Sequence, residues 1–231
     1  MLLAGLQKNS FIDYPGKISC VLFTTGCNFI CPYCHNADLA RGEYPQQLGL
    51  DEITAFLHSR QGMLEGVVIT GGEPTLHEWV VDLCQSIKSL NYPVKLDTNG
   101  SRPDVLDRLL QKELVDFVAM DIKAPLEDYG PFCRIPRIKE SLSESIRHIM
   151  GSATDYEFRT TCAAPFATRE SIEAIARTID GARCYVLQKF NRRAACLDPE
   201  FNRRQDPTIF ADEMKRFQSL AKPFVQRCIV R

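Results

Sequence analysis

The sequence predicts an α/β protein in which one mostly parallel sheet forms an open, partial TIM-like barrel of six βα units. Two observations lead to this class. Short apolar runs alternate along the chain with amphipathic stretches that are long enough for crossover helices. The apolar runs are continuous, as is typical of strands that are buried on both faces. Six units are too few for a closed eight-stranded barrel, and a doubly wound sheet is the rival arrangement.

The elements follow from hydrophobic periodicity and from the residues that interrupt it. Strands are predicted where apolar and β-branched residues run together, at 18–24, 66–70, 94–97, 115–121, 156–161 and 184–190. Helices are predicted where apolar residues recur every three or four positions, at about 50–60, 75–90, 102–112, 139–150 and 168–180. Beyond them we expect one further helix at about 207–221 and a final edge strand within 224–230.

Length and charge limit the protein's class. With 231 residues, of which 45% are hydrophobic and 25% charged, the chain can fill one core, so we expect a single domain over 1–231. A net charge of -1 gives no basic field for nucleic acid, and no apolar run is long enough to span a membrane. The first residues do not resemble a secretion signal, which predicts a cytoplasmic protein.

Three cysteines within eight residues, Cys27, Cys31 and Cys34, are the most informative feature of the chain. Their spacing gathers three thiolates on one loop and offers no fourth cysteine nearby. A cubane iron–sulfur cluster held there would have three irons bound to protein and one iron open. An open coordination position admits a substrate, which separates a working metal site from a sealed structural one.

Structural zinc and disulfide bonds are the alternative uses of these cysteines. Structural zinc usually needs a second cysteine or histidine pair, but His35 directly follows Cys34 and His77 stands alone. Ten cysteines in a chain without a secretory leader favour reduced thiols over disulfides. Most of the remaining cysteines are expected to pack as small apolar residues. The alternative is a second cluster that uses some of Cys133, Cys162, Cys184 and Cys196.

Unusual polar residues fall where the predicted strands end. In barrel folds, the loops at the carboxyl ends of the strands converge on one mouth, and the chemistry collects there. The sequence therefore predicts a site at this mouth. The contributing segments, in strand order, are 27–34, 70–74, 97–100, 120–123, Arg159 and Gln188.

The segment 70–74, with the sequence TGGEP, has two interpretations. It can be a plain turn from strand to helix, with paired glycines for positive φ and Pro74 starting the next helix. Alternatively, the bare backbone lets a ligand's ammonium group approach closely, and Glu73 accepts a hydrogen bond from it. Asn99-Gly100 by itself is an ordinary turn dipeptide.

Asp97 and Asp121 are predicted to end neighbouring strands, so their carboxylates should lie close together. Two like charges about 4 Å apart repel by roughly 4 kcal/mol at an effective dielectric constant near 20. A positive group should therefore lie between them, and the candidates are Lys123, the ammonium group of a ligand, or a monovalent cation. The alternative is two unrelated acids that face solvent.

The cysteine spacing, with Tyr33 just before the third cysteine, resembles the signature of the radical S-adenosylmethionine (SAM) superfamily. The resemblance implies a radical SAM type of partial barrel over about 10–190, with a C-terminal helix and edge strand in 191–231. It implies a [4Fe-4S] cluster on Cys27, Cys31 and Cys34, whose open iron binds SAM. One electron then cleaves SAM to a 5'-deoxyadenosyl radical.

Within that superfamily the chain resembles the activating proteins of glycyl radical enzymes. The resemblance lies in 10–17, 31–36, 96–100 and 121–123, and 155–161 looks most like the activating protein of anaerobic ribonucleoside-triphosphate reductase. It implies that the radical takes hydrogen from a glycine of a partner enzyme, and that a flavodoxin- or ferredoxin-type donor supplies the electron. The alternatives are a radical SAM enzyme for a small molecule, such as a deazapurine precursor, or a non-catalytic iron–sulfur or zinc module.

The resemblance also implies which residues contact the cofactors. No residue is expected to act as an acid or base, because the cluster and SAM carry the chemistry. Gln188 departs from the family, because pyruvate formate-lyase activases have a histidine there. A monovalent cation would lie beside Asp97, Thr98, Met120 and Asp121. The expected SAM-binding residues are Tyr33, His35, Gly71, Gly72, Glu73, Pro74, Asp97, Thr98, Asn99, Asp121, Lys123, Arg159 and Gln188.

Overall fold

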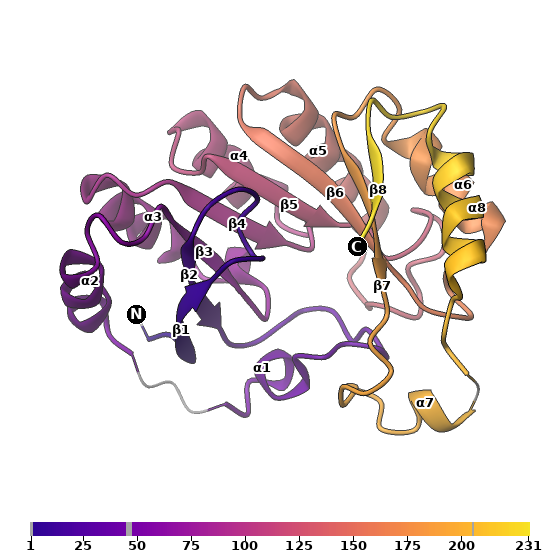
Figure 1. Cartoon of the computed structure of the whole chain (residues 1–231), viewed down its shortest axis with the longest axis horizontal. Helices are drawn as coiled ribbons and strands as arrows, with labels where there is room; N and C mark the ends of the chain where they lie inside the picture. The colour runs from indigo at the N-terminus through magenta and orange to yellow at the C-terminus, as the bar shows by residue number, and fades with distance from the viewer. Residues whose placement is uncertain (1, 45–47, 205) are drawn as a thin grey trace.

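One curved sheet organises the protein (Figure 1). The computed structural model describes residues 2–44, 48–204 and 206–231. Within them, eight strands lie side by side in chain order; β1 is antiparallel to β2, and every later neighbour is parallel. The strands are β1 Gly5–Ser10, β2 Ser19–Thr24, β3 Gly66–Gly71, β4 Val94–Thr98, β5 Phe117–Asp121, β6 Asp155–Cys162, β7 Tyr185–Lys189 and β8 Cys228–Val230.

Helices cover the outer side of the sheet, and Figure 1 shows the small helices α1 and α7 below its open side. None of the helices in the described ranges is both long enough and apolar enough to cross a membrane. The helices are α1 Ala37–Arg41, α2 Leu50–Ser59, α3 Val80–Ser89, α4 Pro103–Gln111, α5 Ile138–Gly151, α6 Arg169–Thr178, α7 Phe201–Arg204 and α8 Ala211–Ala221, together with the 3₁₀ turn η1 Pro74–Leu76.

The predicted open barrel is confirmed, because the sheet does not close on itself and β1 and β8 form its two edges. Two details of the prediction were wrong. Strand β1 was missed, since its sequence GLQKNS has no apolar run and its middle residues are exposed. The helix expected over 75–90 is split, because Pro74 starts only the short η1 turn and α3 begins at Val80. The predicted C-terminal edge strand is β8.

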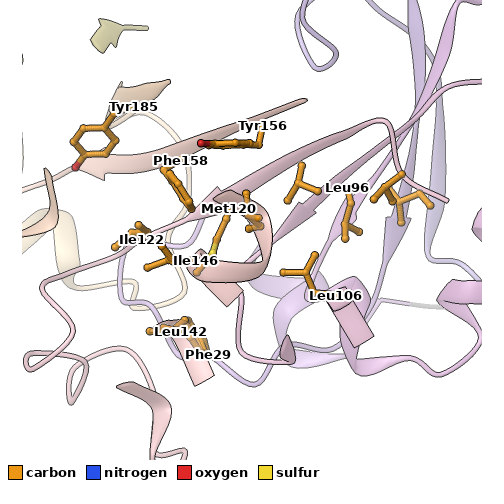
Figure 2. Close-up of a cluster of buried hydrophobic side chains, with 14 of the residues drawn as sticks. Phe29, Leu96, Leu106, Met120, Ile122, Leu142, Ile146, Tyr156, Phe158 and Tyr185 are labelled. Atoms are coloured by element: carbon orange, nitrogen blue, oxygen red, sulfur yellow. The ribbon is translucent and has the colours of Figure 1, made fainter. Parts of the chain in front are cut away.

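The two faces of the strands carry different residues because side chains alternate along a strand. The outer face holds apolar side chains such as Leu96, Met120 and Phe158, which are fully buried beneath the helices (Figure 2). The next residue in each of these strands points to the inner face, as Asp97 does after Leu96 and Arg159 after Phe158. The outer face thus supplies the packing energy, and the inner face is free for polar chemistry.

Helix α6 shows how the local sequence sets an element. Its N-cap Thr168 accepts a hydrogen bond at Oγ1 from the backbone N–H of Ser171, and the Ser171 hydroxyl accepts one from the Thr168 N–H. One helix face then buries Ile172 and Ile175 in the main hydrophobic core, and the helix packs on α8. The cap fixes where the helix begins, and the apolar stripe fixes which face packs.

We predict that Phe158→Ala lowers the free energy of unfolding by about 3–5 kcal/mol, because it leaves a cavity at a side chain with no solvent exposure. Phe210→Ala is the matched control, since Phe210 is 71% exposed, and it should change the free energy by less than about 0.5 kcal/mol. Chemical denaturation measures both values. Equal effects of the two changes would show that β6 does not present Phe158 to the core.

Candidate functional site

A cavity of about 490 Å³ lies on the inner face of the sheet, at the carboxyl ends of the strands. Loops that are far apart in the sequence meet there, as the strand-end argument predicted. Its volume falls within the usual range for ligand pockets. The predicted site residues that line it are Cys27, Cys31, Tyr33, Cys34, His35, Gly71, Gly72, Glu73, Asp97, Thr98, Asn99, Asp121, Lys123, Arg159 and Gln188.

The cysteine loop is held in place by backbone hydrogen bonds. The N–H of Cys27 donates to the Ala40 carbonyl at the end of α1 (3.0 Å), and the N–H of Cys34 donates to the Cys31 carbonyl (3.0 Å). The N–H of Leu197, from the segment after β7, donates to the Cys34 carbonyl (2.9 Å). The three thiols are therefore presented to one cavity by a loop that is anchored at both ends.

The paired glycines of 70–74 are required by close backbone contact. Gly71 has φ 115°. A Cβ at Gly72 would come within 2.1 Å of the Gly26 carbonyl oxygen, so an alanine there would force the two loops apart. The N–H of Glu73 donates to that same oxygen at 2.8 Å. The glycine segment therefore lies directly against the start of the cysteine loop.

The Glu73 carboxylate is engaged by hydrogen bonds from the protein itself. Its side chain is buried, and both carboxylate oxygens are already used by the protein. Oε1 accepts hydrogen bonds from the backbone and hydroxyl of Thr75 and from the Thr98 hydroxyl, and Oε2 accepts one from the Asn99 N–H at 2.6 Å. The carboxylate thus ties the glycine segment to the end of β4 and leaves little capacity for a ligand's ammonium group.

The two aspartates do approach one another, and Arg159 joins them. Its Nη1 lies 3.2 Å from Asp97 Oδ2, and its Nε lies 2.8 Å from Asp121 Oδ1. Lys95 pairs with the other oxygen of Asp97, and Lys123 Nζ lies 3.0 Å from Asp121 Oδ2. The cation between the carboxylates is therefore Arg159, which was not among the three predicted candidates.

These ion pairs set the protonation states. Burial alone would raise the pKa of Asp121, but the charges of Arg159 and Lys123 outweigh it and hold that pKa well below the ordinary value. Asp97 has a lowered pKa for the same reason, with Arg159 and Lys95 as its partners. Asp97 and Asp121 therefore stay ionised at neutral pH. Together with Lys95, Lys123 and Arg159 they form a network of three basic and two acidic side chains.

Tyr33 and His35 line the cavity and are backed by further aromatic rings. Tyr33 is buried among Phe132, Phe166 and Phe201, and His35 stacks on Phe190 with ring centroids 5.1 Å apart. The Tyr33 hydroxyl is buried and has no hydrogen-bond partner in the described part of the chain. A buried hydroxyl in that state is suited to a ligand that supplies the missing partner.

Two predicted site residues lie elsewhere. Pro74 is buried in η1 and does not line the cavity. Met120 is fully buried in the outer core, where its side chain packs against Gly100, so only its backbone could reach a cation on the inner face. The cysteines considered for a second cluster also do not line this cavity; they are Cys133, Cys162, Cys184 and Cys196.

Sequence reasoning missed Lys95 and Asn28. Lys95 is 1% exposed, and the signal was available, because it stands two residues before Asp97 in the same strand and so shares its face. Asn28 accepts a hydrogen bond from the Asn99 amide, and nothing in the spacing of the cysteine loop indicated that contact.

Comparison with protein families identifies the class. The model of the radical SAM superfamily matches residues 21–180, and the chain belongs to that superfamily. It is therefore an enzyme of the radical SAM class, and the family implies a [4Fe-4S] cluster and SAM as cofactors.

Three relatives show where the chain stands within the superfamily. A protein of Methanocaldococcus jannaschii named "Putative glycyl-radical enzyme activating enzyme" is 33% identical over the whole chain and 95% of its own length. The pyruvate formate-lyase-activating enzyme of Clostridium pasteurianum is 24% identical over 78% of this chain and 76% of its own. A 7-carboxy-7-deazaguanine synthase of Halobacterium salinarum is 33% identical, over only 37% of this chain and 33% of its own.

Among solved structures, Streptococcus suis SuiB bound to S-adenosylmethionine superposes with a TM-score of 0.66. The match covers 90% of this chain at 11% identity, and the chain spans about half the length of SuiB. At this identity the match shows the fold alone.

The residues present fit the implied cofactors. Three thiols reach one cavity, and Tyr33, with its unpartnered hydroxyl, lines the same space as Asp97, Asp121, Lys123 and Arg159. Among the described residues, no three His, Cys, Asp or Glu side chains converge tightly enough to hold one metal ion. A cubane does not require that convergence, because each thiolate binds a different iron.

We predict that Asp121→Asn lowers the free energy of unfolding of the cluster-free protein by about 3 kcal/mol at pH 7, because Arg159 and Lys123 lose a shared partner. Since the folded pKa of Asp121 lies below the unfolded value of about 3.9, its contribution is fully present above that value and disappears as pH falls through the folded pKa. The difference from wild type should therefore stay constant from about pH 8 to 5 and shrink below about pH 4.

Urea denaturation at several pH values measures this. Asp212→Asn is the control, because Asp212 is 90% exposed and pairs weakly with Lys215 at 3.9 Å. It should cost less than about 0.5 kcal/mol at every pH. A stable Asp121→Asn protein at pH 7 would contradict the importance of the buried network.

Proposed function

We propose that this protein is an activase that generates a glycyl radical on a partner enzyme, with Cys27, Cys31 and Cys34 as the ligands of its [4Fe-4S] cluster. The observation that carries the proposal is similarity to a protein named as a glycyl-radical enzyme activating enzyme, at 33% identity over the entire chain. The cavity adds support, because all three cysteines line it.

Bound to this protein, the cluster and SAM would supply a 5'-deoxyadenosyl radical, with methionine released when one electron cleaves the sulfonium, and the glycine Cα of the partner would give a hydrogen atom to that radical to form 5'-deoxyadenosine. The protein's own residues bind and orient. We assign the SAM carboxylate and ammonium groups to the charged network of Asp97, Asp121, Lys123 and Arg159, and we assign a hydrogen bond to the Tyr33 hydroxyl. Gln188 and His35 complete the pocket walls.

The open sheet favours a protein substrate. Strands β1 and β8 form unpaired edges of the sheet, and Gln7 of β1 and Asp13 of the following turn line the cavity on one side. A flexible glycine-bearing loop can enter such an opening, whereas a small-molecule site is usually more enclosed.

We further propose that the partner is anaerobic ribonucleoside-triphosphate reductase and that a flavodoxin- or ferredoxin-type protein donates the electron. The support for the reductase is the sequence of 155–161, which forms most of β6 and carries Arg159 into the cavity. The relative from Clostridium pasteurianum acts on another enzyme, pyruvate formate-lyase, so the partner is the part of the proposal most open to test.

A second candidate is a radical SAM enzyme for a small molecule. The similarity to a 7-carboxy-7-deazaguanine synthase favours it, but that similarity covers 37% of the chain. Similarity over the whole chain outweighs it. The two functions differ in one measurable way: only the activase requires a protein to consume the radical productively.

We predict that the anaerobically reconstituted and reduced protein, mixed with SAM and the reductase, produces a doublet electron paramagnetic resonance signal of a glycyl radical on the reductase. Each of Cys27→Ser, Cys31→Ser and Cys34→Ser should abolish both the signal and 5'-deoxyadenosine formation, because a lost thiolate removes an iron ligand.

Cys84→Ser is the matched control, since Cys84 is fully buried in α3 and does not line the cavity. It should keep both products. Formation of 5'-deoxyadenosine without any glycyl signal would point to the small-molecule function, and turnover that survives the three cysteine changes would contradict the cluster assignment.

A monovalent cation beside Asp97 and Asp121 also remains part of the proposal. It would have to bind the lone pairs of the two carboxylates that Arg159, Lys95 and Lys123 leave unused, together with the backbone carbonyls of Thr98 and Met120. We predict that SAM binds about fivefold more tightly in potassium chloride than in tetramethylammonium chloride of equal ionic strength. Anaerobic calorimetry measures this, and equal affinity in the two salts would argue that Arg159 alone suffices.

A further inference from the structure

Asn99 lies where the end of β4 meets the cysteine loop. It is buried to 6% exposure and lines the cavity. Its side-chain Nδ2 is 3.8 Å from the sulfur of Cys27 and 2.9 Å from the Asn28 Oδ1. The sequence predicts that Asn99 contacts SAM, and in the structure its side-chain amide nitrogen faces the cysteine loop.

The orientation of the Asn99 amide is fixed by its partners. Its Oδ1 accepts a hydrogen bond from the backbone N–H of Ser101 at 2.9 Å, so that end must be oxygen and the end near Cys27 must be nitrogen. The orientation of the Asn28 amide follows from this, because the end that faces the Asn99 Nδ2 at 2.9 Å must be oxygen, and its Nδ2 then donates to the Ser101 hydroxyl at 2.8 Å. One Asn99 amide hydrogen therefore points to Asn28 and the other is directed toward Cys27.

The backbone of Asn99 is held as firmly as its side chain. Its N–H donates to Glu73 Oε2 at 2.6 Å, and Glu73 is itself held by Thr75 and Thr98. Both hydrogens of the amide are engaged, which leaves none for SAM. The hydrogen bonds of Asn99 thus hold its amide in one orientation, with an N–H directed toward the sulfur of Cys27.

We propose that Asn99 is a positioning residue that donates an N–H to the sulfur of Cys27 and raises the reduction potential of the cluster. The inference rests on the cluster assignment of the proposed function. Reduction adds one negative charge, which is shared with the thiolate sulfurs, so an N–H directed at a sulfur stabilises the reduced cluster more than the oxidised one.

Cys27 is singled out among the three cluster cysteines. The backbone N–H of Phe29 also donates to its sulfur, at 3.4 Å. Within the described residues, the sulfurs of Cys31 and Cys34 accept no comparable hydrogen bond from the protein. Hydrogen bonds from the protein should therefore stabilise the added negative charge of the reduced cluster most strongly at the iron bound to Cys27.

The test is a redox titration of the reconstituted cluster, followed by electron paramagnetic resonance, without SAM and without a partner. Asn99→Leu keeps the size of the side chain and removes the donor. We expect the equilibrium constant for cluster reduction to fall about tenfold, which for one electron is about 59 mV toward more negative potential. Ser101→Ala is the control: it removes the hydroxyl that holds Asn28 but keeps the backbone N–H that orients Asn99, and it should leave the potential unchanged.

An unchanged potential in Asn99→Leu would overturn the inference, and so would an equal shift in Ser101→Ala, because it would trace the effect to loop movement. If Asn99→Leu assembles no cluster, wild-type protein labelled with ¹⁵N in its asparagine amides replaces it. An electron–nuclear coupling from the label to the reduced cluster supports the contact, and its absence contradicts it. A wild-type protein that binds no cluster would defeat the proposed function instead, so the two failures are distinguishable.

Discussion

Arg159 ties the ends of three neighbouring strands together, and the rest of the site depends on that contact. Its guanidinium reaches Asp97 on β4 and Asp121 on β5 from its own place on β6. Without it, two buried carboxylates would face each other across adjacent strands, and one would have to take up a proton or the strands would have to separate. Lys95 pairs with the other carboxylate oxygen of Asp97, and Lys123 pairs with the other one of Asp121. The inner face of the sheet can therefore be polar and still be packed.

This arrangement explains why the sheet can stay open. A closed barrel fills its interior with layers of branched apolar side chains. Here the apolar packing is concentrated on the outer face under the helices, and the inner face relies on ion pairs near the mouth and on a small apolar cluster of Tyr14, Val21 and Val68 below it. An interior held by ion pairs does not need the sheet edges β1 and β8 to meet, so a cavity with a lateral opening remains.

The sequence was most informative where a residue's role depends on chain neighbours alone. Cysteine spacing and apolar periodicity predicted the cysteine loop, every strand of the sheet except β1, and the mouth where the strands converge. It failed where roles depend on three-dimensional partners. Nothing in the sequence around Glu73 indicates that its carboxylate accepts hydrogen bonds from Thr75, Thr98 and Asn99. Strand β1 was missed because it is an exposed edge held by backbone pairing to β2, without an apolar pattern of its own.

The glycine segment and the cysteine loop are one structural unit, although they are separated by some forty residues in the sequence. Gly72 sits so close to Gly26 that a methyl group would not fit, and Glu73 passes the contact on through Asn99 to the cysteine loop. The residues expected to hold SAM and those expected to hold the cluster therefore cannot shift independently. For a reaction in which one electron must cross from a cluster to a sulfonium, a fixed separation between the two matters more than any acidic or basic side chain. The close packing of two glycine-containing loops supplies that fixed separation within a short chain.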